Sequence, residues 1–255
     1  MSFNWNAIGK RVAIVKDNAK YNKTAVYVNP DADSEDEGFT SMHLDQGKFQ
    51  LVPDPHTERQ ILYITGPSGS GKSFFTKNYI KEWQKINKKG SVYVFSAIKS
   101  DESLDDISNL KRINIGENLI EDEIEAEDLP EGCLTLFDDI DVISNKKVRD
   151  AVYTLLNQIL EVGRHMKISC ICTNHLPTNS HYTRRILNES HYCVWFPQSG
   201  GTKQMRYLLT EYLGLDREMI RRTKKLKSRA VVMFKHFPQF LMAERDIFLL
   251  NQDDD

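Results

Sequence analysis

A glycine-rich segment, GPSGSGKS at residues 66–73, carries the strongest chemical signal in the chain. It fits the pattern G-x-x-x-x-G-K-S/T, in which the glycines let the main chain curl so that several N–H groups point at phosphate oxygens. The helix that follows adds the positive end of its dipole. The lysine suits the β- and γ-phosphates, and the hydroxyl after it suits Mg²⁺. We therefore expect ATP to bind at Gly66, Pro67, Ser68, Gly69, Ser70, Gly71, Lys72, Ser73 and Phe74, with Ser73 also a metal ligand.

Two adjacent carboxylates, Asp138 and Asp139, follow the apolar run LTLF. In a phosphate-loop fold the first acid after such a strand holds Mg²⁺, and a neighbouring group can orient the attacking water. Successive side chains of a strand face opposite ways, which suits two different roles. We expect Asp138 to hold the metal and Asp139 to act as the base, although the reverse assignment stays open and Asp141 is a further candidate. A solvated turn is the alternative, because DDID is also good turn chemistry.

Polar side chains also end a third apolar run, ISCICTN at residues 168–174. Ligands bind at the carboxyl ends of strands in open parallel sheets. The amide of Asn174 or the hydroxyl of Thr173 could therefore contact the γ-phosphate or the lytic water, unless these residues form a helix cap or a turn before Pro177. A guanine-binding motif N-K-x-D is missing from the nearest candidate, NKKV at Asn145, which weighs against a GTPase.

Two groups of cations are candidates for contacts with anions. Arg164 follows the helix after the acids and could reach the γ-phosphate of a neighbouring subunit, as arginine fingers do. A cation interacting with the dipole of its own helix is the alternative, and Arg184 and Arg185 are rival fingers. The basic helical segment 216–229 could follow a phosphodiester backbone, or it could be a solvated helix face.

The pattern around these residues predicts strands that alternate with helices. Strands are expected at 60–65, 91–96, 133–139, 167–175 and 191–197, and helices at 73–90, 146–165, 202–215 and 217–229, with closing strands at 230–237 and 246–251. Such alternation favours a mainly parallel sheet. Residues 1–55 read as a small β extension with short strands within 11–28 and an acidic loop at 29–38. The phosphate-loop domain is expected to span residues 56–255.

Composition excludes several classes of function. With 34 Lys and Arg against 36 Asp and Glu, the net charge is −2, so binding of nucleic acid would need a local basic patch. No apolar run approaches the roughly 20 residues of a membrane helix, and the amino terminus has no signal-peptide core. We expect no membrane association. The cysteines form no CxxC pair, and buried thiols are expected at Cys133, Cys170, Cys172 and Cys193.

The order of the motifs resembles the genome-packaging ATPases of poxviruses and other large DNA viruses, in the FtsK–HerA group of phosphate-loop motors. The resemblance is carried by GPSGSGKS, LTLFDDI and EVGRHMKISCICTNHLPTNSHYTRRILNESHYCVWF, between about residues 59 and 197. It implies a RecA-like α/β domain with a mainly parallel central sheet and helices on both faces. Lys72 and Ser73 inherit the phosphate and Mg²⁺ roles, Asp138 the metal, Asp139 the base, Asn174 the sensor and Arg164 the finger. Asp139 and Asn174 stand where many relatives carry glutamate and glutamine.

The resemblance also implies partners and a place of action. It describes a pentameric or hexameric ring that moves double-stranded DNA into a preformed capsid and contacts capsid proteins. Such a ring would act in the host cytoplasm at the site of viral assembly, or in the virion. Two other functions stay open: a nucleotide or nucleoside kinase, which shares the loop, and an ATPase that remodels a protein partner during virion assembly.

Overall fold

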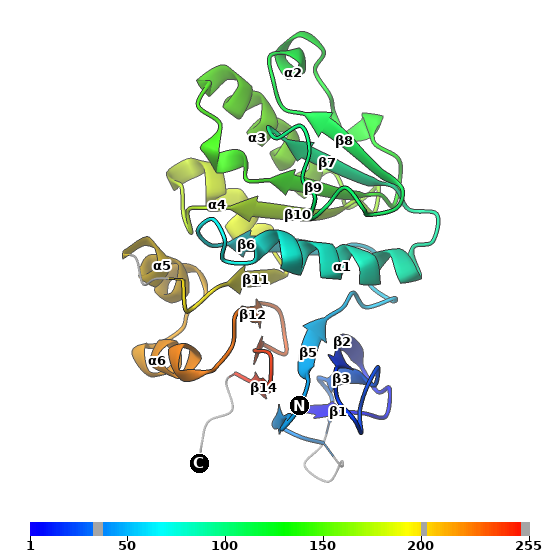
Figure 1. The fold of residues 1–255 in the computed structure, drawn as a ribbon, viewed down its shortest axis with the longest axis vertical. Helices are drawn as coiled ribbons and strands as arrows, with labels where there is room; N and C mark the ends of the chain where they lie inside the picture. Colours follow the sequence, from blue (N-terminus) through cyan, green and yellow to red (C-terminus); the bar gives the residue numbers. More distant parts are fainter. Residues whose placement is uncertain (33–37, 200–202, 251–255) are drawn as a thin grey trace.

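A ten-stranded mixed sheet forms the centre of the computed structural model, which describes residues 1–32, 38–199 and 203–250 (Figure 1). Its parallel part confirms the expected mainly parallel α/β sheet and comprises, in spatial order, β8 (Leu110–Asn114), β7 (Val92–Ser96), β9 (Leu134–Asp138), β10 (Ser169–Asn174), β6 (Ile61–Thr65) and β11 (Tyr192–Trp195). An antiparallel part continues beyond β11 with β12 (Val231–Phe234), β13 (Phe240–Met242), β14 (Asp246–Leu249) and β4 (Ser41–His43).

Helices cover both faces of the sheet, as expected. Along each strand the side chains alternate between two cores. Leu62, Leu136 and Ile171 share one core with α1 (Lys72–Ile86), which contributes Tyr79, Ile80 and Trp83. Tyr63, Phe137 and Cys172 share the other with α3 (Lys146–Glu161) and α4 (Ser180–Glu189). The four cysteines are free and buried, which confirms the expected thiols.

The remaining helices are short and differ in part from the sequence pattern. They are α2 (Asn118–Glu121), the 3₁₀ turns Ala126–Asp128 and Ile140–Val142, α5 (Lys203–Tyr207) with a π-helical turn Leu208–Tyr212, and α6 (Arg217–Lys225). The helix expected to reach residue 229 thus ends at Lys225. Leu226 is extended there, and Gln198 Nε2 donates to the carbonyls of Lys224 (3.2 Å) and Leu226 (3.4 Å). These bonds satisfy carbonyls that the end of a helix leaves without partners.

The first 55 residues form a second sheet that packs on the first. Strands β1 (Ser2–Asn4), β3 (Ala25–Asn29), β2 (Lys10–Lys16) and β5 (Lys48–Leu51) are antiparallel. Phe3 is fully buried, and its ring meets Phe240 of β13 edge-on at 5.7 Å between centroids. Strand β4 pairs with β14, so this region also contributes to the large sheet. Residues 33–37 of the expected acidic loop lie outside the described residues. In the described part, no helix is long and apolar enough to cross a membrane.

Replacing Phe3 by alanine tests whether the two sheets share one core. Removing a buried phenylalanine costs about 3–5 kcal/mol of unfolding free energy, which corresponds to a fall in Tm of roughly 10 °C for a chain of this size. Urea unfolding and calorimetry measure both quantities. Phe39→Ala is the matched control, because Phe39 is half exposed and its truncation should cost under about 1 kcal/mol. An unchanged main transition in Phe3→Ala would show that the amino-terminal sheet is energetically separate.

Candidate nucleotide-binding site

The phosphate loop leaves the carboxyl end of β6 and enters α1 at Lys72. Gly69 and Gly71 have φ of 74° and 116°, a region that favours glycine. Pro67, Ser68 and Gly69 are exposed, so the main chain at the tip of the loop is accessible. The loop is anchored to its neighbour by a hydrogen bond of 3.1 Å from the Gly66 N–H to the carbonyl of Asn174.

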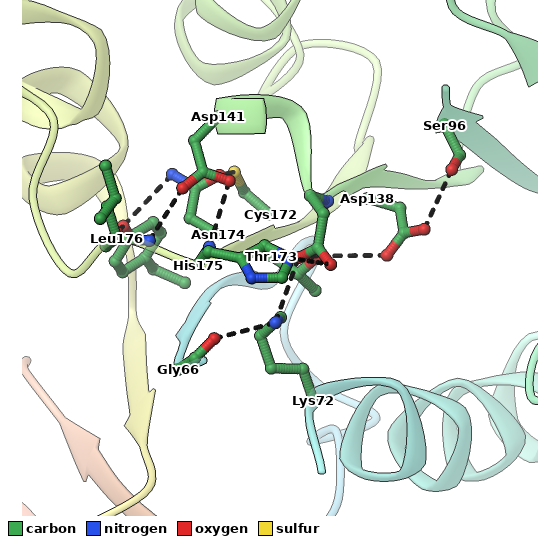
Figure 2. A network of polar contacts seen from close by, with 12 residues as sticks. Gly66, Lys72, Ser96, Asp138, Asp141, Cys172, Thr173, Asn174, His175 and Leu176 are labelled. Carbon is green, nitrogen blue, oxygen red and sulfur yellow. Dashed lines mark hydrogen bonds and ion pairs between the residues drawn. The ribbon is translucent and has the colours of Figure 1, made fainter. Parts of the chain in front are cut away.

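Lys72 and Asp139, which the motifs assigned to one site, lie close together. The lysine side chain is almost fully buried, and its Nζ donates to the Gly66 carbonyl at 2.9 Å. It also forms an ion pair with Asp139 Oδ1 at 3.4 Å (Figure 2). A phosphate entering the loop would therefore meet a lysine whose charge is already balanced by the neighbouring acid.

The hydroxyl of Thr173 links the two acids. It lies 3.2 Å from Asp138 Oδ1 and 3.0 Å from Asp139 Oδ1, and it accepts a 2.8 Å hydrogen bond from the Asp139 N–H. The other oxygen of Asp138, Oδ2, accepts from Ser96 Oγ at 3.0 Å. Asp138 is thus held at both carboxylate oxygens by hydroxyls from the strands on either side (Figure 2).

The alternation of side chains along the strands explains which groups meet. Ile171, Leu136 and Val94 all face the α1 core, and Thr173, Asp138 and Ser96 lie two residues further along their strands. They therefore face the phosphate loop. Asn174 has the opposite parity and is fully buried, with its Nδ2 3.3 Å from the hydroxyl of Tyr63. The structure brings Thr173 to the acids, but it does not bring the side chain of Asn174 there.

Asp139 departs from this alternation because its backbone is left-handed, with φ 47° and ψ 44°. Strained backbone of this kind occurs at functional sites when the surrounding structure imposes it. The turn directs Asp139 to the same side as Asp138, contrary to our expectation from strand geometry. Its Oδ2 lies 2.8 Å from His175 Nε2. Asp141, the further candidate, instead accepts the N–H groups of His175 (3.1 Å) and Leu176 (2.8 Å) and holds the loop after β10.

Burial raises the pKa of Asp138 above its ordinary value, and the charge of Asp139 raises it further. The hydrogen bonds from Ser96 and Thr173 act in the opposite direction because they stabilise the ionised carboxylate. Desolvation and the neighbouring negative charge therefore both destabilise the ionised form of Asp138. A cation beside Asp138 would relieve both effects.

The donor set fits a magnesium ion that arrives with phosphates. Within the described ranges, no three His, Cys, Asp or Glu side chains are arranged to hold a metal. Asp138 and the half-buried Ser73 at the start of α1 offer one carboxylate and one hydroxyl. Mg²⁺ commonly uses one or two carboxylates and completes its shell with water and substrate phosphates. The residues therefore suit a complex of Mg²⁺ with a nucleotide better than the free ion.

The predicted arginines lie away from this edge of the sheet. Arg164 is exposed and lines a cavity with Arg59 and His191, near the amino-terminal ends of β6 and β11. Arg185 Nη1 pairs with Glu161 Oε1 at 2.5 Å, and Arg184 is exposed. Neither region borders the phosphate loop of the same chain, so a finger role for any of the three would require a second copy.

Arg229 contacts the loop, and sequence reasoning missed it. Its Nε donates to the Ser70 carbonyl at 2.9 Å and its Nη2 to the Gly69 carbonyl at 3.4 Å. No local sequence signal marks this residue, since it lies 159 positions from Ser70. Ser96 and His175 were also not assigned, and Thr173 was only one of two candidates with Asn174. Strand alternation would have singled out Ser96 and Thr173. Beside Arg229 lies a pocket lined by Gly71, Phe74, Phe75, Phe196 and Ala230, among others.

The mainly parallel sheet and the glycine-rich loop between β6 and α1 together identify a phosphate-loop NTPase fold. The structure matches B204, the DNA-packaging ATPase from Sulfolobus turreted icosahedral virus, with a TM-score of 0.51 and 15% identity, covering 74% of this chain and 98% of B204. It also matches EssC (ATPases 2 and 3) from Geobacillus thermodenitrificans, with a TM-score of 0.53 and 14% identity, covering 85% of this chain and 45% of that one. At these identities the likeness establishes the fold.

Sequence comparison gives a nearer relative. No protein-family model matches the chain. It is 37% identical over 232 residues to the uncharacterized protein V3 of Sputnik virophage, covering 88% of this chain and 89% of that protein. The chain therefore belongs to the same family as the virophage protein V3.

The raised pKa of Asp138 predicts that Asp138→Asn stabilises the protein when no metal is added. An acid whose pKa is higher in the folded state contributes stability that is lost as the pH rises. At pH 7, with chelator present, the neutral amide should add about 1 kcal/mol, or 2–4 °C in Tm, and the gain should vanish under acidic conditions where Asp138 is protonated. Scanning calorimetry across pH measures this difference.

Asp106→Asn is the matched control for this prediction. Asp106 is exposed, and its pKa is lowered, first of all by the hydrogen bond from Lys77. The same substitution there should bring no gain at neutral pH. A fall in Tm for Asp138→Asn at neutral pH would contradict the inferred repulsion.

Proposed function

We propose that this chain is an ATP-hydrolysing motor that translocates double-stranded DNA into a viral capsid. The observation that carries the proposal is the meeting of Lys72, Asp138 and Asp139 beside the phosphate loop. The fold supports it, because B204, which shares that fold, is the DNA-packaging ATPase of its virus. The relationship to a virophage protein supports a viral role.

The loop residues 66–74 and Lys72 would hold the triphosphate of ATP, with Ser73 and Asp138 on the metal. Bound Mg²⁺ would supply positive charge to the phosphate oxygens. The pocket lined by Phe74 and Phe196 would take the base, since Phe74 is 59% exposed and offers an aromatic face beside the loop. An aromatic face is sufficient for a base to stack on, and a hydrogen bond to the base is not required.

Hydrolysis would begin when the γ-phosphate draws Lys72 away from Asp139. Asp139 then accepts a proton from a water whose oxygen attacks the γ-phosphorus, while the bond to the ADP oxygen breaks. His175 Nε2 lies 2.8 Å from this carboxylate and would position it. The Thr173 hydroxyl lies 3.0 Å away, and its one proton can be donated either to Asp139 or to Asp138. We propose that the side chain of Thr173, in place of that of Asn174, acts as the sensor by contacting the γ-phosphate or the lytic water. Asn174 would contribute through its carbonyl, which holds Gly66 N–H in the loop.

The remaining charge on the transferred phosphoryl group calls for a cation from a second copy of the chain. Arg229 already donates to carbonyls on the outer side of the loop. Arg164, Arg184 and Arg185 are the candidates in trans. Arg185 is already paired with Glu161, and of the other two Arg164 is preferred because the resemblance implies it. A homo-oligomeric ring on a capsid, at the site of viral assembly or in the virion, would place these arginines at neighbouring sites.

Lys72→Ala should abolish ATP turnover, because it removes both the phosphate contact and the partner of Asp139. The loss should exceed about 100-fold, as for other groups that stabilise transition-state charge. ATP hydrolysis with and without double-stranded DNA, together with the mass of the assembly, measures the proposed function. Lys81→Ala on the exposed side of α1 is the control and should retain activity. Full activity in Lys72→Ala would refute the phosphate-loop assignment, and phosphorylated nucleosides as products would indicate a kinase.

Arg164→Ala should leave binding of MgATP intact and reduce hydrolysis by about 10³-fold or more, as loss of an arginine finger does. Mixing this variant with Lys72→Ala subunits should restore part of the activity, because each variant supplies the group that the other lacks. Nucleotide affinity, turnover and mixing curves test this directly. If mixing restores nothing while both variants assemble, the finger lies at another residue.

A further inference from the structure

Helix α6 presents a basic surface that the nucleotide site does not use. Its cations and the lysine that follows are exposed and, within the described ranges, none has an acidic partner within 4 Å: Arg217, Arg221, Arg222, Lys224, Lys225 and Lys227. Glu218 is the one acid within the helix. The chain as a whole has a net charge of −2, so this concentration of positive charge is local.

The helix is fixed in a way that keeps these cations outward. Met219 and Ile220 pack against the α3 core, and Thr223 is fully buried. At 100° per residue, Arg217, Arg221, Lys224 and Lys225 fall within an arc of about 100° on the opposite side. The Asp216 side chain caps the start of the helix by accepting the Met219 N–H at 2.6 Å, and Gln198 holds its end. The charged face is therefore preset rather than formed on binding.

The dimensions of this face match a nucleic-acid backbone. Nine helical residues rise about 13 Å, and each strand of B-DNA carries a phosphate about every 3.4 Å along the axis, so roughly four phosphates lie within the length of α6. Arg222, at the margin of the arc, stacks 4.0 Å over the ring of Phe248, which fixes the edge of the surface. Beyond the helix, Lys227 lines a cavity with Arg245, His43 and Asp246, where the Asp246 carboxylate is paired with His43 at 2.7 Å.

We propose that the basic face of α6, formed by Arg217, Arg221, Lys224, Lys225 and Lys227, binds the phosphodiester backbone of duplex DNA. The inference rests on the proposed function only for the role of that DNA as the substrate of the motor. Binding through phosphates fits a motor that must accept every sequence of a genome, because phosphate contacts carry no base information.

Helix α6 is connected through Arg229 to the phosphate loop. Arg229 lies four residues after Lys225, and its side chain donates hydrogen bonds to the carbonyls of Gly69 and Ser70. Its own N–H lies 3.4 Å from Glu244 Oε2, in the turn between β13 and β14. The segment that contacts DNA therefore continues directly into a contact with the phosphate loop.

The test compares two adjacent lysine pairs in the full-length protein. Lys224→Gln/Lys225→Gln removes two charges from the proposed surface. Lys88→Gln/Lys89→Gln removes the same two charges after the carboxyl end of α1, where both lysines are exposed. Fluorescence anisotropy with a labelled 30-base-pair duplex, at several salt concentrations and with two unrelated sequences, gives the affinity and its salt dependence.

The α6 pair should weaken duplex binding about 10-fold and lower the slope of log K against log salt by about 2, equally for both sequences. The Lys88/Lys89 pair should bind as the wild type does. Equal effects of both pairs, no effect of the α6 pair, or a wild type that does not bind duplex would each overturn the inference. Displacement of the duplex by polyglutamate at equal charge concentration would also overturn it, because the surface would then be a general polyanion site.

Two further measurements separate this inference from the proposed function and from misfolding. Tm should change by no more than a few degrees in either pair, since loss of a charge near a helix end costs about 0.3–1 kcal/mol. ATP hydrolysis without DNA should be the same in all three proteins. If ATP is hydrolysed and Lys224→Gln/Lys225→Gln binds the duplex as tightly as the wild type does, only the DNA surface is refuted. If none of the three proteins hydrolyses ATP but Lys224→Gln/Lys225→Gln loses duplex binding, the motor function is refuted and the DNA surface is supported.

Discussion

The site depends on three parallel strands that end together. Strand β10 lies between β6 and β9, with Asn174 opposite Thr65 and Cys172 opposite Phe137. Because of this register, the loop after β6, the acids at the end of β9 and the hydroxyl near the end of β10 lie close together. A shift of one residue in any of these strands would turn its polar side chain to the opposite core. The parallel register therefore determines the chemistry as well as the fold.

Two unfavourable features meet where the proposed chemistry takes place. Asp138 is buried beside a second carboxylate and has a raised pKa. Asp139 has a left-handed backbone without being glycine. Around them, the two cores follow strand alternation and the cysteines are inert buried thiols. Left-handed non-glycine residues also occur elsewhere, for example at Asn109 and Lys167. At the site, the left-handed backbone of Asp139 coincides with the raised pKa of Asp138, and such local conflicts are expected where a protein gives up stability for function.

The sequence predicted the parts of this site that are encoded locally. The loop motif, the double acid and the alternation of strands and helices each span few residues, and the parallel sheet with helices on both faces is confirmed. The choice between Thr173 and Asn174 required knowing which face of β10 meets the loop. The turn of Asp139 and the contact of Arg229 arise from tertiary structure, as does the pairing of β4 with β14. No pattern within a short window contains that information.

The two sides of the phosphate loop have opposite polarity, and this limits how Arg229 can act. In a curled loop the N–H groups face the phosphates, so the carbonyls point away from them. Arg229 binds two of those carbonyls, and its guanidinium is therefore on the outer side of the loop. A guanidinium held there can fix the shape of the loop, but it cannot contact a γ-phosphate without releasing both carbonyls. Neutralising the transferred phosphoryl group then requires either a rearrangement of this segment or an arginine from another subunit, and the second route leaves the loop intact during the reaction.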